Sequence, residues 1–335
     1  MAPRVSVVLA VRDGERYLES SVRSILGQCL RDLELIVVDD GSADRTPEIL
    51  QRLQRTENRL VVLRQKRQGQ AAALNQGLLA ARGEYIARQD ADDISHPERL
   101  ERQVVFLDAH PTVGVVGSWA DVIDESGMVV GRLTAPVGAR YVRRHLLTLR
   151  STPVHGSILA RKEAIASAGG YREAFRLAQD FDLWLRLSER FDIRNLEEVL
   201  YQWRMARHSL RGHRREVQLK YAGIALVFAG ERRLGAGDSY DLLERSNGEL
   251  DRFADRYRLG GAVHAIWGEL LLRGLGNSRQ VRRHLRRALL RGHTSLWTLC
   301  LLCWAHLVLP WPGGRPLEPA GPSLETPVGA VERER

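Results

Sequence analysis

The chain has 335 residues, of which 44% are hydrophobic and 27% charged, as in an ordinary globular protein. This composition, with only three cysteines, excludes a collagen-like chain, a wholly disordered chain and a disulfide-stapled scaffold. The formal net charge of +9 leaves nucleic acid, an anionic membrane or an acidic substrate open as partners.

The first part of the chain predicts strands and helices in alternation. Short continuous apolar runs, typical of buried parallel strands, lie at 5–11, 33–38, 59–63 and 84–88. Stretches with helical periodicity follow the first three of these runs, at 15–27, 46–53 and 70–82. The alternation predicts an α/β domain with a mainly parallel sheet.

The rest of the chain predicts a smaller subdomain and then helices. Pro97 begins a helix that runs to about Asp108, and 113–130 reads as two strands joined by a turn at 124–127. Residues 140–203 mix helices with short strands. We therefore expect an α/β domain over 1–211, a helical extension over 212–312 and a disordered tail, rich in Pro, Gly and Glu, over 313–335.

Two acidic clusters each follow a predicted buried strand, where open α/β sheets bind their ligands. In the first, Asp39-Asp40-Gly41-Ser42, carboxylates can accept hydrogen bonds from a nucleotide base or ribose, although a helix-capping turn is an equally good reading. In the second, Asp90-Ala91-Asp92-Asp93, carboxylates two apart can bind Mg²⁺ or Mn²⁺ and through it a diphosphate. Three acids in four residues exceed what capping requires.

Four ordered blocks of the sequence resemble a known family. They are VSVV (5–8), ELIVVDDGS (34–42), GEYIARQDADD (83–93) and QDFDLWLR (179–186). Together they resemble the family 2 inverting glycosyltransferases, whose GT-A fold is a Rossmann-like sheet with an acceptor subdomain. The resemblance covers about residues 5–203 and implies that 1–211 is the catalytic domain.

The resemblance implies a role for individual acids. Asp40 would contact the base of the donor nucleotide, with Asp39 supporting it. Asp92 would be the main metal ligand, with Asp90 on the ribose or metal side. Asp180 stands where the family has its catalytic base, which takes the acceptor's proton in a single displacement.

Some positions depart from the family pattern. Gln179 replaces the usual Glu beside the base, and Arg12 stands where many relatives have an aromatic residue that stacks on the nucleotide. A guanidinium can also stack on a base. His155 lies in a block that usually reads His-Pro-Ser and is either near the diphosphate or a structural histidine. The remaining candidates are Ala10 for the nucleotide, Asp93 for the acidic cluster, and Arg67 and Arg88 for the diphosphate.

The predicted activity is transfer of a sugar from a UDP- or dTDP-sugar to a saccharide or lipid-linked acceptor, in surface polysaccharide or glycolipid synthesis. Two alternatives stay open. A sugar-nucleotide-forming nucleotidyltransferase would need a glycine-rich basic loop after the first strand, but 11–16 holds one glycine and two acids. A nucleic-acid-binding protein is suggested only by the basic tail, without a recognisable reading module. The donor sugar, acceptor and linkage depend on expected loops at 134–153 and 196–213.

The C-terminal part predicts either a membrane contact or a packed helical hairpin. Residues 279–291 form a basic amphipathic pattern, and 296–309 is strongly apolar. At helical rise that run spans about 21 Å, short of the ~30 Å core of a bilayer. We expect a cytoplasmic protein, since the first residues enter a strand directly, and 294–311 either docks on the membrane face or packs on a neighbouring helix.

Overall fold

A computed structural model describes most of the chain before residue 292: residues 2–151, 153–205, 213–235, 237–246, 249–256, 261, 263–268 and 278–291. The chain divides into two compact units, Met1–Tyr257 and Arg258–Arg335, which are taken separately below. The segment 294–311 and the predicted tail at 313–335 lie outside the described residues. The domain boundary expected at residue 211 stays a prediction.

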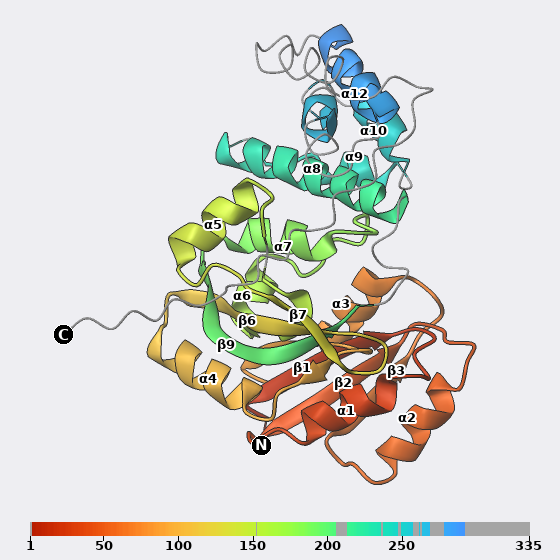
Figure 1. Cartoon of the computed structure of the whole chain (residues 1–335), viewed down its shortest axis with the longest axis vertical. Helices are drawn as coiled ribbons and strands as arrows, with labels where there is room; N and C mark the ends of the chain where they lie inside the picture. The colour runs from red at the N-terminus through yellow and green to blue at the C-terminus, as the bar shows by residue number, and fades with distance from the viewer. Residues whose placement is uncertain are drawn as a thin grey trace, which may run out of the picture. The chain divides into compact units, whose positions relative to one another are not determined.

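The first unit is built on one 9-stranded sheet (Figure 1). Its strands are β1 (Val5–Val11), β2 (Leu33–Asp39), β3 (Leu60–Arg64), β4 (Tyr85–Asp90), β5 (Ile94–Ser95), β6 (Val113–Ile123), β7 (Val129–Leu133), β8 (Leu159–Arg161) and β9 (Asp192–Arg204). They follow the order β3-β2-β1-β4-β8-β6-β9-β5, with β7 paired to β6. The first four strands of this order are parallel, as predicted, and β8 joins them to the second half in antiparallel pairs.

The described helices lie between and after these strands. In the first unit they are α1 (Leu18–Leu26), α2 (Thr46–Gln54), α3 (Gln70–Ala80), α4 (Arg99–Ala109), α5 (Ala139–Leu147), α6 (Lys162–Ser167), α7 (Gln179–Leu187), α8 (His213–Arg233), α9 (Tyr240–Glu244) and α10 (Leu250–Arg256), with a 3-10 turn at His155–Ser157. In the second unit, α12 (Ser278–Leu290) follows the predicted basic amphipathic pattern and buries Val281, Leu285 and Ala288.

The parallel strands carry helices on both faces, because successive side chains of a buried strand point to opposite sides. Val7 and Leu9 of β1 pack into a core shared with α1, α2 and α4. Val8 points the other way, toward α3, where a Cβ on Gly77 would lie 2.4 Å from its Cγ1. The sheet is thus covered on both faces and its strand ends are left for ligands.

The second half of the sheet differs from the sequence-based expectation. Residues 140–203 were expected to hold short strands and 196–213 a loop, but β9 is a 13-residue strand that pairs with β6 in parallel and ends at Arg204. Register shifts near Trp119 break the two-residue alternation that would have marked a long strand. The loop expected at 134–153 likewise contains α5.

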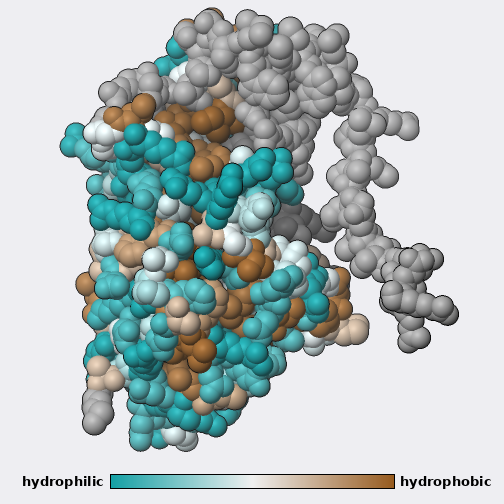
Figure 2. Space-filling model, turned by 90° about the vertical axis from the view of Figure 1, so that its left-hand side faces the viewer, coloured by the Kyte–Doolittle hydropathy of each residue, from teal (hydrophilic) through white to brown (hydrophobic). Residues whose placement is uncertain are grey.

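The surface of the chain is mixed in character. On the face that Figure 2 shows, hydrophilic residues predominate and hydrophobic residues gather in separate patches. Among the described residues no helix is both long enough and apolar enough to cross a membrane.

Candidate active site

The carboxyl ends of β1, β2 and β4 bring the first group of predicted residues together. Ala10 of β1 pairs with Asp90 of β4. On the other side of β1, Asp39 pairs with Val11, whose carbonyl accepts a 2.9 Å hydrogen bond from the backbone N–H of Asp40. These residues therefore lie along one edge of the parallel sheet, where a ligand site is expected.

Asp40 holds the loop between β3 and α3. Its buried carboxylate accepts hydrogen bonds from the Gln65 side chain (2.8 Å) and from the backbone N–H groups of Gln68 (2.7 Å) and Gly69 (2.9 Å). Arg67 is exposed on the loop so formed. The structure thus gives Asp40 a role in shaping this edge, and its direct contact with a nucleotide base stays a prediction.

Asp39 and Arg12 belong to the turns that follow β2 and β1. The Asp39 carboxylate accepts a hydrogen bond from the backbone of Ser42 (3.0 Å), whose hydroxyl accepts one from the backbone of Asp13 (2.9 Å). Arg12 lies 3.5 Å from the Asp13 carboxylate, with its side chain 39% exposed. The two turns are therefore tied together, and Arg12 stands at their solvent-facing rim.

The acidic cluster after β4 is fixed from two sides. Arg88, which is only 2% exposed, donates to the Asp90 carboxylate at 2.6 Å. From β9, the backbone of Arg204 donates to the Asp93 carboxylate (2.7 Å) and its guanidinium donates to the Asp92 carbonyl (2.8 Å). Arg88 is therefore placed to hold Asp90, and its predicted contact with a diphosphate stays a prediction.

The acidic cluster carries negative charge that the protein does not fully compensate. Burial and the neighbouring Asp90 charge raise the pKa of Asp92. Burial, followed by the charges of Asp90 and Asp92, raises the pKa of Asp93 well above its ordinary value. The Asp93 Oδ2 atom is buried and has no hydrogen-bond partner among the described residues. A bound cation would relieve this repulsion.

The residues present fit a cation that is shared with a substrate. No group of three or more His, Cys, Asp or Glu side chains that could hold a metal ion is found in the part of the chain that the structure describes. Asp90 and Asp92 offer two carboxylates, and Mg²⁺ commonly binds through one or two carboxylates plus substrate phosphates and water. The site therefore suits a metal–diphosphate complex better than a metal alone.

Asp180 faces the same region from α7. The helix begins directly after Ala178, which has a left-handed backbone (φ 57°). At its first position Gln179 donates to the side chain of Gln70 on α3, at 2.9 Å. Asp180 and Asp90 line one cavity of about 360 Å³. Side chains about 90 positions apart in the sequence therefore meet across a single space.

Other parts of the chain complete this cavity. The remaining lining residues are Leu133, Thr134, Ala135, Ser151, Pro153, Val154, His155, Gly156 and Trp203. The His155 Nε2 atom lies 2.7 Å from the Tyr171 hydroxyl. Burial and the Arg88 cation lower the pKa of His155, although Asp180 and Asp90 oppose this. His155 is therefore a neutral, hydrogen-bonded wall residue beside both carboxylates.

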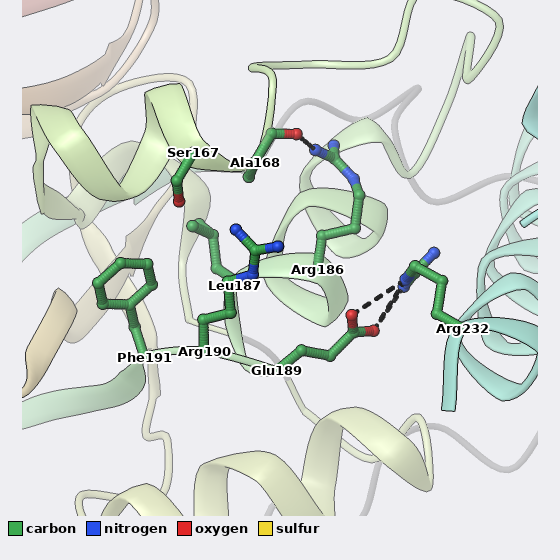
Figure 3. Close-up of a pocket in the computed structure, with 8 residues that line it drawn as sticks. All are labelled: Ser167, Ala168, Arg186, Leu187, Glu189, Arg190, Phe191 and Arg232. Carbon is green, nitrogen blue, oxygen red and sulfur yellow. Dashed lines mark hydrogen bonds and ion pairs between the residues drawn. The ribbon is translucent and has the colours of Figure 1, made fainter. Parts of the chain in front are cut away.

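Buried ion pairs anchor α7. Asp182 is fully buried and paired with Arg186 at 2.8 Å, and Arg186 also donates to the Ala168 carbonyl (Figure 3). Glu189, just beyond the helix, pairs with Arg232 of α8 at 2.9 Å. These groups surround a smaller cavity of about 130 Å³. Because Arg186 and Arg232 are already engaged, these ion pairs and hydrogen bonds hold α7, and with it Asp180, in place.

Comparison with known proteins identifies the family. EpsE of Bacillus subtilis (strain 168), which is named as a glycosyltransferase, is 38% identical over 238 residues, covering 69% of this chain and 83% of EpsE. The chain belongs to glycosyl transferase family 2. The model of that family matches residues 6–168. The O-antigen biosynthesis glycosyltransferase WbnJ of Escherichia coli is 30% identical over 205 residues, covering 60% of this chain and 79% of WbnJ.

Solved structures show that this family 2 glycosyltransferase has the GT-A fold. S. aureus TarS 1–349 in complex with UDP-GlcNAc superposes with a TM-score of 0.62 at 17% identity, covering 90% of this chain and 87% of that one. The mannosyltransferase PcManGT from Pyrobaculum calidifontis, in complex with GDP-Man and Mn²⁺, gives 0.54 at 21% identity, covering 91% and 80%. The predicted fold class and enzyme class are confirmed.

Sequence reasoning missed the contribution of β9 to this glycosyltransferase. The Tyr201 hydroxyl accepts a hydrogen bond from the backbone N–H of Asp90 (3.2 Å), and Trp203 lines the cavity. Arg204 fixes the acidic cluster as described above. Tyr201 and Trp203 are two residues apart and so share a face of the strand. The alternating pattern Tyr-Gln-Trp at 201–203 is a signal for a strand that places both aromatic residues on one face, but it lies within the loop expected at 196–213.

Proposed function

We propose that this family 2 glycosyltransferase moves a sugar from a nucleoside-diphosphate sugar to a hydroxyl of a saccharide acceptor, with inversion at the anomeric carbon. The observation that carries the proposal is that Asp90 and Asp180 line one cavity from opposite parts of the chain. In a single displacement one carboxylate takes the proton of the attacking oxygen, on the side of the sugar opposite the leaving diphosphate. Asp180 would be that carboxylate, and Asp90 lies on the side of the diphosphate.

In this mechanism Asp180 is the base. The acceptor oxygen attacks the anomeric carbon while its proton passes to the Asp180 carboxylate, and the nucleoside diphosphate leaves with the electron pair of the broken bond. The bond from Gln179 to Gln70 holds the start of α7, and the Asp182–Arg186 pair holds its body. Gln179 carries no charge, so Asp180 acts without an adjacent acid at that position.

Asp92 and Asp90 would hold a divalent metal together with the diphosphate. Such a metal, Mg²⁺ or Mn²⁺, supplies Lewis-acid stabilisation of the leaving diphosphate when it is bound. The Mn²⁺ in the complex of PcManGT supports this assignment. Within the chain, Arg88 fixes Asp90 by a buried ion pair, and Asp40 fixes the loop on which Arg67 is exposed. In this proposal Arg67 would approach the diphosphate from solvent.

The proposed donor is a UDP- or dTDP-sugar, and the proposed product is a surface polysaccharide or glycolipid. The UDP-GlcNAc complex of TarS and the naming of WbnJ in O-antigen biosynthesis support these classes. At the nucleotide end of the site, Ala10, Asp39 and Arg12 would meet the base and ribose. A position at the cytoplasmic membrane face, where lipid-linked acceptors are found, is part of the same proposal.

A titration of nucleotides tests the proposal. UDP, dTDP and GDP would be titrated calorimetrically into the full chain with Mn²⁺ and with EDTA. We expect binding of UDP or dTDP that depends on Mn²⁺, and about a tenfold or greater loss of affinity in Asp92→Asn, because a carboxylate ligand is removed. Asp32→Asn, at an exposed carboxylate, is the control. Absence of binding by all three nucleotides, or equal binding in EDTA and in Asp92→Asn, would contradict the proposal.

A further inference from the structure

The segment from 128 to 141 exposes an unusual amount of apolar surface. Six of the large hydrophobic side chains that stand out as exposed in the described part of the chain fall within it: Met128 (68%), Val129 (55%), Val130 (47%), Leu133 (38%), Val137 (38%) and Tyr141 (62%). Three of the six, Val129, Val130 and Leu133, belong to β7, an edge strand that pairs only with β6 within the described sheet. Exposed apolar side chains that are concentrated in one segment favour a contact with another molecule.

The same segment is cationic. Residues 126–162 contain no Asp or Glu. On α5, Val142 and Leu146 are buried, so that Arg140, Arg143 and Arg144 point to solvent. None of these three arginines forms an ion pair with a residue that the structure describes, in contrast to Arg132, which pairs with Asp121. We call the exposed residues of 128–144 the β7–α5 surface.

The β7–α5 surface adjoins the cavity that holds Asp180. Leu133, Thr134 and Ala135, at the end of β7, line that cavity, and so do residues from Ser151 onward, just after α5. The intervening loop is tied to the sheet, because the Trp119 indole donates to the Ala135 carbonyl at 3.0 Å and the Asn195 amide donates to the Pro136 carbonyl at 2.7 Å. Whatever binds this surface is therefore held next to the cavity.

We propose that the β7–α5 surface docks on an anionic phospholipid membrane and so presents the cavity to the lipid–water interface. Aliphatic and aromatic side chains can enter the headgroup region while arginines contact acidic headgroups. This membrane contact lies in the catalytic unit and is independent of the contact expected for 294–311. It also goes beyond the transfer reaction, because docking needs no donor or acceptor.

Two other occupants fit the surface less well. A twofold pairing of two copies through β7 would leave the α5 arginines without acidic partners from this segment, since 126–162 contains no Asp or Glu in either copy. A soluble acidic polysaccharide would engage the arginines but would leave Met128, Val129 and Val130 exposed to water. An anionic lipid surface engages both kinds of side chain at once.

Vesicle co-sedimentation tests the proposal with the full chain. The probes are phosphatidylcholine vesicles and vesicles of mixed phosphatidylcholine and phosphatidylglycerol. We expect the wild type to prefer the mixed vesicles. The triple variant Arg140→Glu, Arg143→Glu, Arg144→Glu should partition about a hundredfold more weakly, since each basic residue near such a surface contributes about fivefold. The double variant Val129→Ser, Val130→Ser should also bind less.

A matched variant controls for charge elsewhere in the molecule. Arg31, Arg55 and Arg233 are exposed and form no ion pair with a described residue, and their replacement by Glu changes the net charge equally. The basic segment 279–291 is the same in all variants, so the comparison isolates α5. The proposal would be overturned by equal losses in the two triple variants or by no binding of the wild type to mixed vesicles. It would also be overturned if the wild type bound soluble dextran sulfate as strongly as it binds the vesicles and the valine changes had no effect on that binding.

Discussion

At the scale of single residues, the ion pair between Arg88 and Asp90 determines how much negative charge the acidic cluster carries. The Arg88 guanidinium is buried beneath the acidic cluster and neutralises Asp90 at 2.6 Å. Although burial opposes it, the Asp90 charge keeps the pKa of Arg88 raised, so the Arg88 guanidinium stays charged. Asp92 and Asp90 are the two carboxylates that would hold a metal–diphosphate complex, whereas Asp93 is buried and accepts a hydrogen bond from the Arg204 backbone. One buried cation thus fixes the Asp90 carboxylate beside the cavity that this residue lines.

Gly156 is required by its contact with Tyr201. A Cβ at this position would lie 1.9 Å from the Tyr201 hydroxyl, which accepts a hydrogen bond from the Asp90 backbone. We predict that Gly156→Ala lowers the free energy of unfolding by about 1–3 kcal/mol, the usual cost of overpacking, and reduces transfer by displacing Tyr201. Thermal denaturation and initial rates measure the two effects.

Gly138→Ala is the matched control for this change. Its Cβ would lie 3.4 Å from Tyr141, an ordinary contact, and its backbone φ of −77° suits any residue. If Gly138→Ala and Gly156→Ala melted at the same temperature, the close packing of Gly156 on Tyr201 would not be a determinant of stability.

At the scale of elements, the parallel half of the sheet was predictable and the other half was not. Apolar runs such as 33–38 are typical of buried strands, and the acidic turns after them stand where α/β sheets bind their ligands. The alternation in β9 is hidden because register shifts opposite Trp119 interrupt it and because Glu197 and Glu198 make its centre look like a loop. The pairing of β9 with β6 is a long-range contact that no local pattern encodes.

Glu34 ties β2 to the end of α3 and makes stability depend on pH. It is nearly buried, and although burial alone raises its pKa, hydrogen bonds from Ser6 and Arg82 lower the net pKa below its ordinary value of 4.5. A carboxylate with a lowered pKa stabilises the fold above its ordinary pKa, and this stabilisation is lost as pH falls through the lowered value. We predict that Glu34→Gln melts below the wild type at neutral pH and that the difference shrinks below about pH 4.5.

Glu48→Gln, at an exposed carboxylate of α2, is the control and should change stability by less than about 0.5 kcal/mol at either pH. Melting temperatures across an acid-to-neutral series give the comparison. A difference between Glu34→Gln and the wild type that stays constant with pH would mean that the Glu34 charge does not stabilise the link between β2 and α3.

At the scale of the whole molecule, the cavity joins segments that are distant in the sequence. Asp90 ends β4 in the parallel half of the sheet, Asp180 lies in the first turn of α7, and Leu133 and Trp203 line the same cavity. The sequence indicated the two carboxylates separately, and only the family resemblance implied that they act together. Their meeting depends on the order β4-β8-β6-β9, which spacing along the chain does not reveal.

The central claim is that Asp180 accepts the acceptor's proton in a cavity where the donor is held by other residues. Asp180→Asn keeps the shape of the side chain but removes its basicity. We predict that transfer falls by about a hundredfold or more, while Mn²⁺-dependent binding of the donor nucleotide, measured on the same preparation, changes by less than about twofold, since Asp180 is not a donor ligand. Full turnover by Asp180→Asn with intact donor binding would show that another group is the base.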